Sequence, residues 1–190
     1  MEYRIGTVIT AMMTTVILIV LSISALMLFF KLARGRSASV HSLEDLSGQT
    51  HPVDIEAFRN LIDPAEEEFL RSNLSPQKFR AVRRERLRAT LDYVQCASHN
   101  AAVLLRLGEG ARESADPRVA QAAQHLIDSA IRLRLNALLA MPKLYLGIAI
   151  PGARLTPNGL IDGYQQLSSF AGQLALTQNP ARAPRLSTVL

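Results

Sequence analysis

The residues that could do chemistry are few, and the closest pair among them is Cys96 and His99. Their spacing of three would place both side chains on one helix face, where they could offer two metal ligands. A structural zinc site needs about four ligands and a catalytic one about three. His125 is the nearest third candidate, but an antiparallel helix hairpin would leave it about 7 Å away along the axis. We therefore expect neither a metal nor another cofactor, and interpret Cys96 as a small buried thiol beside a partly exposed histidine.

Motifs for nucleophilic or phosphate chemistry do not occur in the sequence. G-x-S-x-G, H-E-x-x-H and the P-loop pattern are all missing. Gly108 and Gly110 stand near an expected helix end, where a stop signal explains them better than a phosphate cradle. An enzyme of unfamiliar type would need titratable groups converging in a cleft, for which Asp92, His99 and His125 are the candidates. We therefore expect a non-enzymatic protein.

The strongest single feature is a hydrophobic run at residues 5–30 that contains no Asp, Glu, Lys or Arg. As a helix it would exceed the roughly 30 Å hydrocarbon core of a bilayer. A cleaved signal peptide has a shorter apolar region, about 7–15 residues, that follows a basic segment. Here the start is barely basic and the basic residues follow the run. The pattern predicts a retained, single-pass transmembrane helix.

The flanking charges predict the orientation of that helix. Lys31, Arg34 and Arg36 follow the run, whereas Arg4 precedes it and is offset by Glu2. The positive-inside bias then favours a short N-terminus outside and residues 31–190 in the cytoplasm. The same residues explain over half of the net charge of +5, since the other 154 residues hold 17 basic and 15 acidic ones. The single cysteine, which permits no intrachain disulfide, fits a cytoplasmic domain.

Small residues form a stripe along the expected membrane helix. The stripe consists of Ala11, Thr15, Ser22 and Ala25, at steps of four, seven and three. Small faces let membrane helices approach closely, which would allow a homo-oligomer. The alternative is that the hydroxyls only satisfy carbonyls of their own helix.

Helix start signals recur through the rest of the chain. Four capping residues are each followed by proline, at Asp63-Pro64, Ser75-Pro76, Asp116-Pro117 and Thr156-Pro157. A capping oxygen accepts an unpaired N–H, and proline suits the first helical position. The expected helices are Val53–Ile62, Pro64–Ser72, Pro76–Arg112, Pro117–Met141 and Gly159–Thr177.

The two long segments predict a hairpin at the centre of the fold. Pro76–Arg112 carries one apolar stripe, whereas Pro117–Met141 is apolar on most faces and is expected to be the most buried helix. Pro142 is expected to end or kink it. The alternation over Leu144–Ile150 predicts an extended apolar segment packed across the helices. A lipid or small-molecule pocket could lie between this segment and the central helix.

A basic cluster opens the first long helix, with Lys78, Arg80, Arg83, Arg84 and Arg88 as candidate contacts. They could bind anionic headgroups or a protein partner. Nucleic acid is a third, less favoured reading. The alternative is internal pairing, because residues 44–70 carry a net charge of −7 beside a net +6 at residues 71–88. This compensation favours internal pairing or a solvated face.

These patterns predict an all-α protein: one N-terminal transmembrane helix plus a soluble bundle of four to five helices around a long antiparallel hairpin. The expected divisions are a short segment 1–4, the membrane helix 5–30, a basic stretch and linker 31–52, a helical domain 53–177 and a frayed tail 178–190. The expected function is a membrane-anchored adaptor, scaffold or accessory subunit that recruits or stabilises protein partners. The alternative is a membrane-tethered sensor of a lipid or small molecule.

Overall fold

The computed structural model describes residues 15, 19, 22–23, 49–150 and 159–178. Within these ranges all regular structure is helical, which confirms the all-α prediction, and no strand occurs. The helices are α2 Ile55–Ile62, α3 Pro64–Asn73, α4 Pro76–Ala111, α5 Pro117–Ala149 and α6 Leu160–Gln178. The expected Thr156-Pro157 start and the tail 179–190 lie outside the described residues.

The chain divides into two compact units, Met1–Ala38 and Ser39–Leu190. In the first unit only Thr15, Ile19, Ser22 and Ile23 are described, and they are helical and exposed. Nearly all of the expected membrane helix at residues 5–30 therefore falls outside the described part. Within that part, no helix combines the length and apolar character that crossing a bilayer requires.

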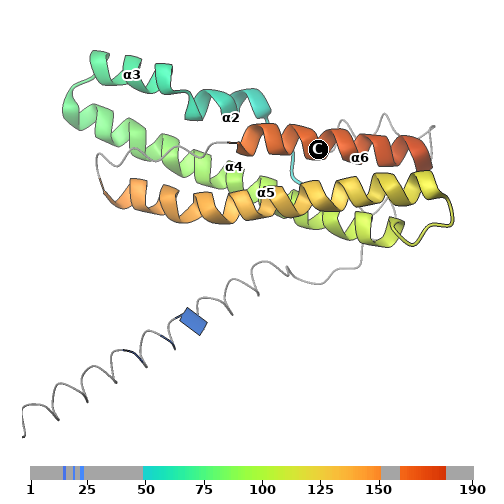
Figure 1. Cartoon of the computed structure of the whole chain (residues 1–190). Helices are drawn as coiled ribbons and strands as arrows, with labels where there is room; N and C mark the ends of the chain where they lie inside the picture. Colours follow the sequence, from blue (N-terminus) through green and yellow to red (C-terminus); the bar gives the residue numbers. More distant parts are fainter. Residues whose placement is uncertain (1–14, 16–18, 20–21, 24–48, 151–158, 179–190) are drawn as a thin grey trace, which may run out of the picture. The chain divides into compact units, whose positions relative to one another are not determined.

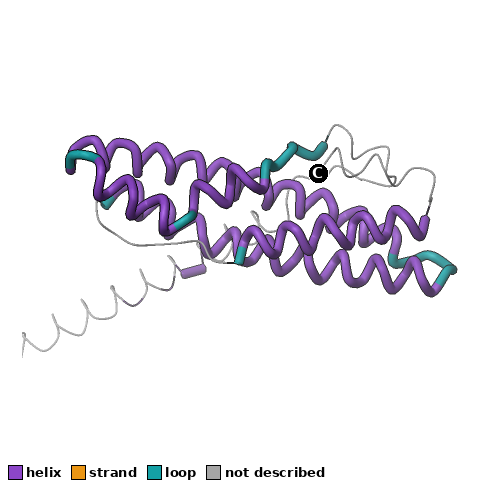
Figure 2. Tube along the Cα trace, turned by 90° about the horizontal axis from the view of Figure 1, so that it is seen from above, coloured by secondary structure: helices purple, strands orange, loops and turns teal. Residues whose placement is uncertain are grey.

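In the second unit, α4 and α5 form the central antiparallel hairpin (Figure 1). Helix α6 packs along α5, whereas α2 and α3 pack against α4. Figure 2 shows from above that short loops join α2 to α3 and α4 to α5. The hairpin is thus the scaffold on which every other described helix of this unit is placed.

Three of the predicted helix starts are confirmed at the residue level. Pro64, Pro76 and Pro117 each occupy the first turn of a helix. The carboxylates of Asp63 and Asp116 accept hydrogen bonds from backbone N–H groups of that turn, at 2.9 and 2.8 Å. These bonds satisfy donors that the helix itself leaves unpaired, which fixes where each helix begins.

The expected extended segment at Leu144–Ile150 is wrong, because α5 continues through Pro142 to Ala149. Proline removes one backbone hydrogen bond from the helix, yet packing of the following turns favours its continuation. Leu144 is fully buried, and a Cβ on Gly147 would come within 3.3 Å of Leu87 on α4. In this stretch, residues three and four positions apart therefore face the core, as in any helix. The alternation over Leu144–Ile150 that suggested an extended segment is coincidental.

The central helix was expected to be the most buried one, but one of its sides is exposed. Ala130, Leu133 and Ala137 are fully buried, but Ile131 and Leu139 are 51% and 58% exposed. One side of α5 packs on α4 and α6, and the opposite side carries exposed apolar residues from Ile131 onward.

Gly108 is not the stop signal that its position suggested. It is buried inside the last turns of α4, and its backbone lies directly against α5. A Cβ at this position would be 2.8 Å from Ile127 Cγ1 and 3.2 Å from the carbonyl oxygen of Ala123. The glycine therefore permits a close approach of the two long helices.

We expect Gly108→Ala to destabilise the protein by about 1–3 kcal/mol, because overpacking outweighs the gain in helix propensity. The matched control is Gly172→Ala on α6, where an added Cβ would meet nothing within 4 Å. There the change should stabilise by about 0.5–1 kcal/mol. Urea unfolding of both variants in mild detergent compares them, and equal effects at the two positions would contradict the close contact.

Candidate interaction surfaces

The acidic segment and the basic start of α4 are joined by two ion pairs. Arg83 Nε lies 3.1 Å from Glu67 Oε1, and Arg86 Nη1 lies 2.9 Å from Glu66 Oε1. The two arginine side chains are only 11% and 15% exposed. For Arg83 this matches the internal-pairing alternative, and the pairs hold α3 against α4.

Arg86 also fixes the end of α2, a role that the sequence analysis did not assign. Its Nη2 donates to the carbonyl oxygens of Asn60 and Leu61 at 2.8 and 3.1 Å. These carbonyls belong to the last turn of α2, where the helix leaves acceptors unpaired and a cation is favourable. One guanidinium thus ties the end of α2 and the start of α3 to α4.

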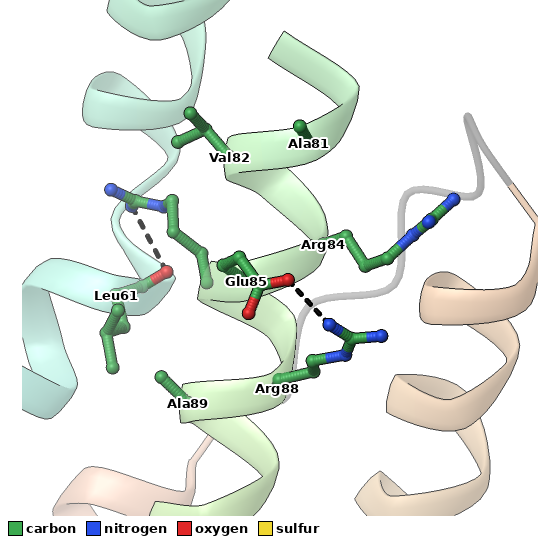
Figure 3. Close-up of a pocket in the computed structure, with 8 residues that line it drawn as sticks. Leu61, Ala81, Val82, Arg84, Glu85, Arg88 and Ala89 are labelled. Carbon is green, nitrogen blue, oxygen red and sulfur yellow. Dashed lines mark hydrogen bonds and ion pairs between the residues drawn. The ribbon is translucent and has the colours of Figure 1, made fainter. Parts of the chain in front are cut away.

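The other basic candidates of the cluster are exposed. These are Lys78, Arg80, Arg84 and Arg88. Arg88 Nη1 lies 2.6 Å from Glu85 Oε1 on the same helix, and both side chains are more than half exposed. Such an exposed pair contributes about 0–1 kcal/mol, so it leaves the arginine available for other contacts. Figure 3 shows Arg84 and Arg88 on the side of α4 opposite to Leu61.

An open depression of about 540 Å³ lies over α4 beside the end of α2 (Figure 3). Apolar side chains and a mixed set of charges line it. The lining residues are Leu61, Ala81, Val82, Ala89, Arg84, Glu85, Arg86 and Arg88. A small apolar patch with charges of both signs around it resembles the core and rim of a protein interface.

Cys96 and His99 do not belong to a metal cluster in the part of the chain that the structure describes. His99 Nε2 donates to the carbonyl oxygen of Gln49 at 2.8 Å, and its ring lies 5.0 Å from the His51 ring. His125 stacks on Phe170 of α6 at 5.7 Å. The two candidate histidines therefore contact different segments, one the linker and the other α6.

Asn100 is a buried polar residue that the sequence analysis missed. Its Nδ2 donates to the His51 carbonyl oxygen at 2.7 Å and to the Tyr164 hydroxyl at 2.8 Å. Its Oδ1 accepts from the His51 backbone N–H at 2.9 Å. One amide thus holds the linker before α2 and ties α4 to α6. Burial raises the pKa of Tyr164 from its ordinary value, and the hydrogen bond from Asn100 opposes that rise.

The charged residues of α5 interact within the helix or face solvent. Asp128 Oδ1 accepts from Gln124 Nε2 at 3.0 Å. Arg132 is exposed. Burial, and secondarily the nearby charge of Arg106, lower the pKa of Arg134.

The candidates in the N-terminal unit are described only in part. Thr15 and Ser22 of the small-residue stripe are helical and exposed. The other members, Ala11 and Ala25, and the flanking Lys31, Arg34 and Arg36 lie outside the described residues. Association through this helix and its orientation stay predictions.

The described residues 49–150 and 159–178 form an all-helical bundle. No protein-family model, curated protein or solved structure matches the chain.

Proposed function

We propose that the chain is a membrane-anchored helical adaptor or accessory subunit that recruits or stabilises a protein partner and performs no chemistry itself. The observation that carries this proposal is the depression over α4, in which Val82 is exposed among paired charges. An exposed apolar patch with a polar rim supports a docking function. The anchor is the uncharged run at residues 5–30, with the domain on the cytoplasmic side.

The use of the described polar groups supports binding rather than catalysis. Asn100 donates hydrogen bonds to the Tyr164 hydroxyl and to the His51 carbonyl oxygen in the linker. Thr90 donates to the Arg86 carbonyl oxygen at 2.8 Å. Asp92 and His99, two of the candidates for an enzyme, are exposed. Exposed positions differ from the enclosed cleft in which the titratable groups of a catalytic site converge.

The sensor alternative loses the pocket on which it depended. That pocket was expected between the central helix and a separate segment at Leu144–Ile150. Because Leu144 and Gly147 belong to α5 itself and are buried against the bundle, the two walls of the pocket are one helix.

Purification of the full chain in mild detergent, with identification of what co-purifies, tests the adaptor proposal. We expect one protein partner that is retained by the wild type and lost with Val82→Glu, which places a charge in the depression. Gln95→Glu is the matched control, because it adds the same charge at another exposed position of α4. A chain that purifies alone at every salt concentration would contradict the proposal, as would equal partner loss with both variants.

A further inference from the structure

The C-terminal half of α5 carries an exposed apolar row. Its members are Ile131, Leu135, Leu139 and Leu146, and Ile150, the residue that caps the helix, follows them; each is 47–58% exposed. The steps of four, four and seven keep the four helical members on one side of the helix, and exposed Pro142 fills the longest step. At 1.5 Å per residue the helical part of the row extends for about 22 Å.

This row is not a continuation of the surface of the first half of α5. On the same side, the preceding turns present Gln121, Gln124 and Asp128, all exposed. The buried side is apolar along the helix except for Ser129, so packing of the core does not explain the change on the exposed side. The exposed side changes from polar to apolar at Ile131, which indicates that a different medium contacts it from there.

The charged residues of α5 that follow Ile131 are all basic. Between Asp128 and Asp162 the sequence contains basic residues but no acidic one. Arg132 and Lys143 are exposed next to the row on α5. The contact of Gly147 with Leu87 also places this half of α5 beside the exposed arginines at the start of α4. Those arginines, at positions 80, 84 and 88, follow one another at helical spacing.

We propose that this face of α5 lies on the surface of an anionic bilayer. An apolar stripe with basic flanks is the pattern by which a helix inserts shallowly at the headgroup boundary. A second copy of the chain would bring the same basic flanks together, which repel. A protein partner would need acidic flanks of its own. The bilayer is favoured because the proposed anchor keeps one within reach, so the inference rests on that part of the proposed function.

The test uses the full chain with Cys96→Ala, carrying one new cysteine labelled with an environment-sensitive fluorophore. The test positions are Leu139→Cys and Leu146→Cys, and the control is Gln173→Cys, which is exposed on α6. Each protein is reconstituted into vesicles of phosphatidylcholine, with or without phosphatidylserine. A cooperative thermal transition equal to that of Cys96→Ala shows that each labelled chain is folded.

We expect lipid-borne nitroxide quenchers to quench the labels at positions 139 and 146, more strongly when phosphatidylserine is present, and to spare the control label. Charge reversal by Arg132→Glu with Lys143→Glu should shift the equilibrium away from the docked state about tenfold or more, since each basic residue near an anionic surface contributes about 1 kcal/mol.

Two results would overturn the inference. Test labels that aqueous iodide quenches as strongly as the control face solvent. Test labels protected from both iodide and the lipid quencher are covered by protein, either a partner or a second copy. Flotation of the chain with the vesicles is read separately. If the chain floats with the vesicles but its test labels face solvent, this inference alone is contradicted. If the chain does not float, the proposed anchor is contradicted as well.

Discussion

Asn100→Ala is expected to lower the free energy of unfolding by about 2–4 kcal/mol, because it removes three hydrogen bonds at once. Tyr164 is 1% exposed, and its hydroxyl would lose this hydrogen-bond donor in the interior. Each lost hydrogen bond costs about 0.5–1.5 kcal/mol, and two of the three involve the His51 backbone. Urea unfolding of the full chain in mild detergent measures the change.

Asn136→Ala on the exposed surface of α5 is the matched control, with an expected effect within about 0.5 kcal/mol. Hydrogen exchange supplies a second readout, because the His51 amide is protected by Asn100 Oδ1 at 2.9 Å. We expect that amide to exchange faster in Asn100→Ala and to be unchanged in the control. Equal unfolding free energies for the two variants would show that the amide does not hold the linker.

Leu133→Ala is expected to destabilise the protein by about 2–5 kcal/mol, whereas Leu139→Ala should change its stability by less than about 0.5 kcal/mol. Leu133 is fully buried between α5 and α6, where its Cδ1 would lie 3.4 Å from a Cβ on Gly163. Its truncation leaves a cavity in addition to the lost burial. Leu139, less than two turns away, is 58% exposed.

Comparison of Leu133→Ala with Leu139→Ala tests directly whether one side of α5 is buried and the other exposed. The same urea unfolding experiment applies to both variants, and each removes the same atoms from the same helix. A loss of stability at Leu139 as large as that at Leu133 would mean that the outer side of α5 packs against the folded protein. The exposed apolar row would then be part of the core.

The helix starts could be predicted because each depends on two adjacent residues. A carboxylate followed by proline, as at Asp63-Pro64 and Asp116-Pro117, satisfies its own helix end without help from the rest of the fold. The acidic and basic segments also indicated pairing, and Arg83 with Glu67 shows it. Such signals are local and can be read from sequence alone.

The errors fall where tertiary packing outweighs a local signal. Pro142 marks a helix end by itself, but burial of Leu144 and the Gly147 contact continue α5 past it. Gly108 likewise resembles a helix end in the sequence. Its role in the close approach of α4 to α5 depends on Ile127 of the other helix, which its sequence neighbours do not indicate. The sequence of α5 is apolar on most faces, which fits either burial or contact with a second apolar medium. Only the positions of α4 and α6 show which side is covered.

Asn100 could not be recognised beforehand, because its partners His51 and Tyr164 are 49 and 64 residues away in the sequence. A lone asparagine in a helical segment is most often a surface residue.

Membrane anchoring through residues 5–30 is the central claim, and extraction of membranes with alkaline carbonate tests it most directly. Carbonate strips proteins that are held only by surface contacts, including the contact proposed for α5, but leaves a helix that spans the bilayer. We predict that the chain stays in the membrane pellet at the mass of all 190 residues. Release into the supernatant at that mass, or recovery of a shorter chain cleaved after the run, would contradict the account.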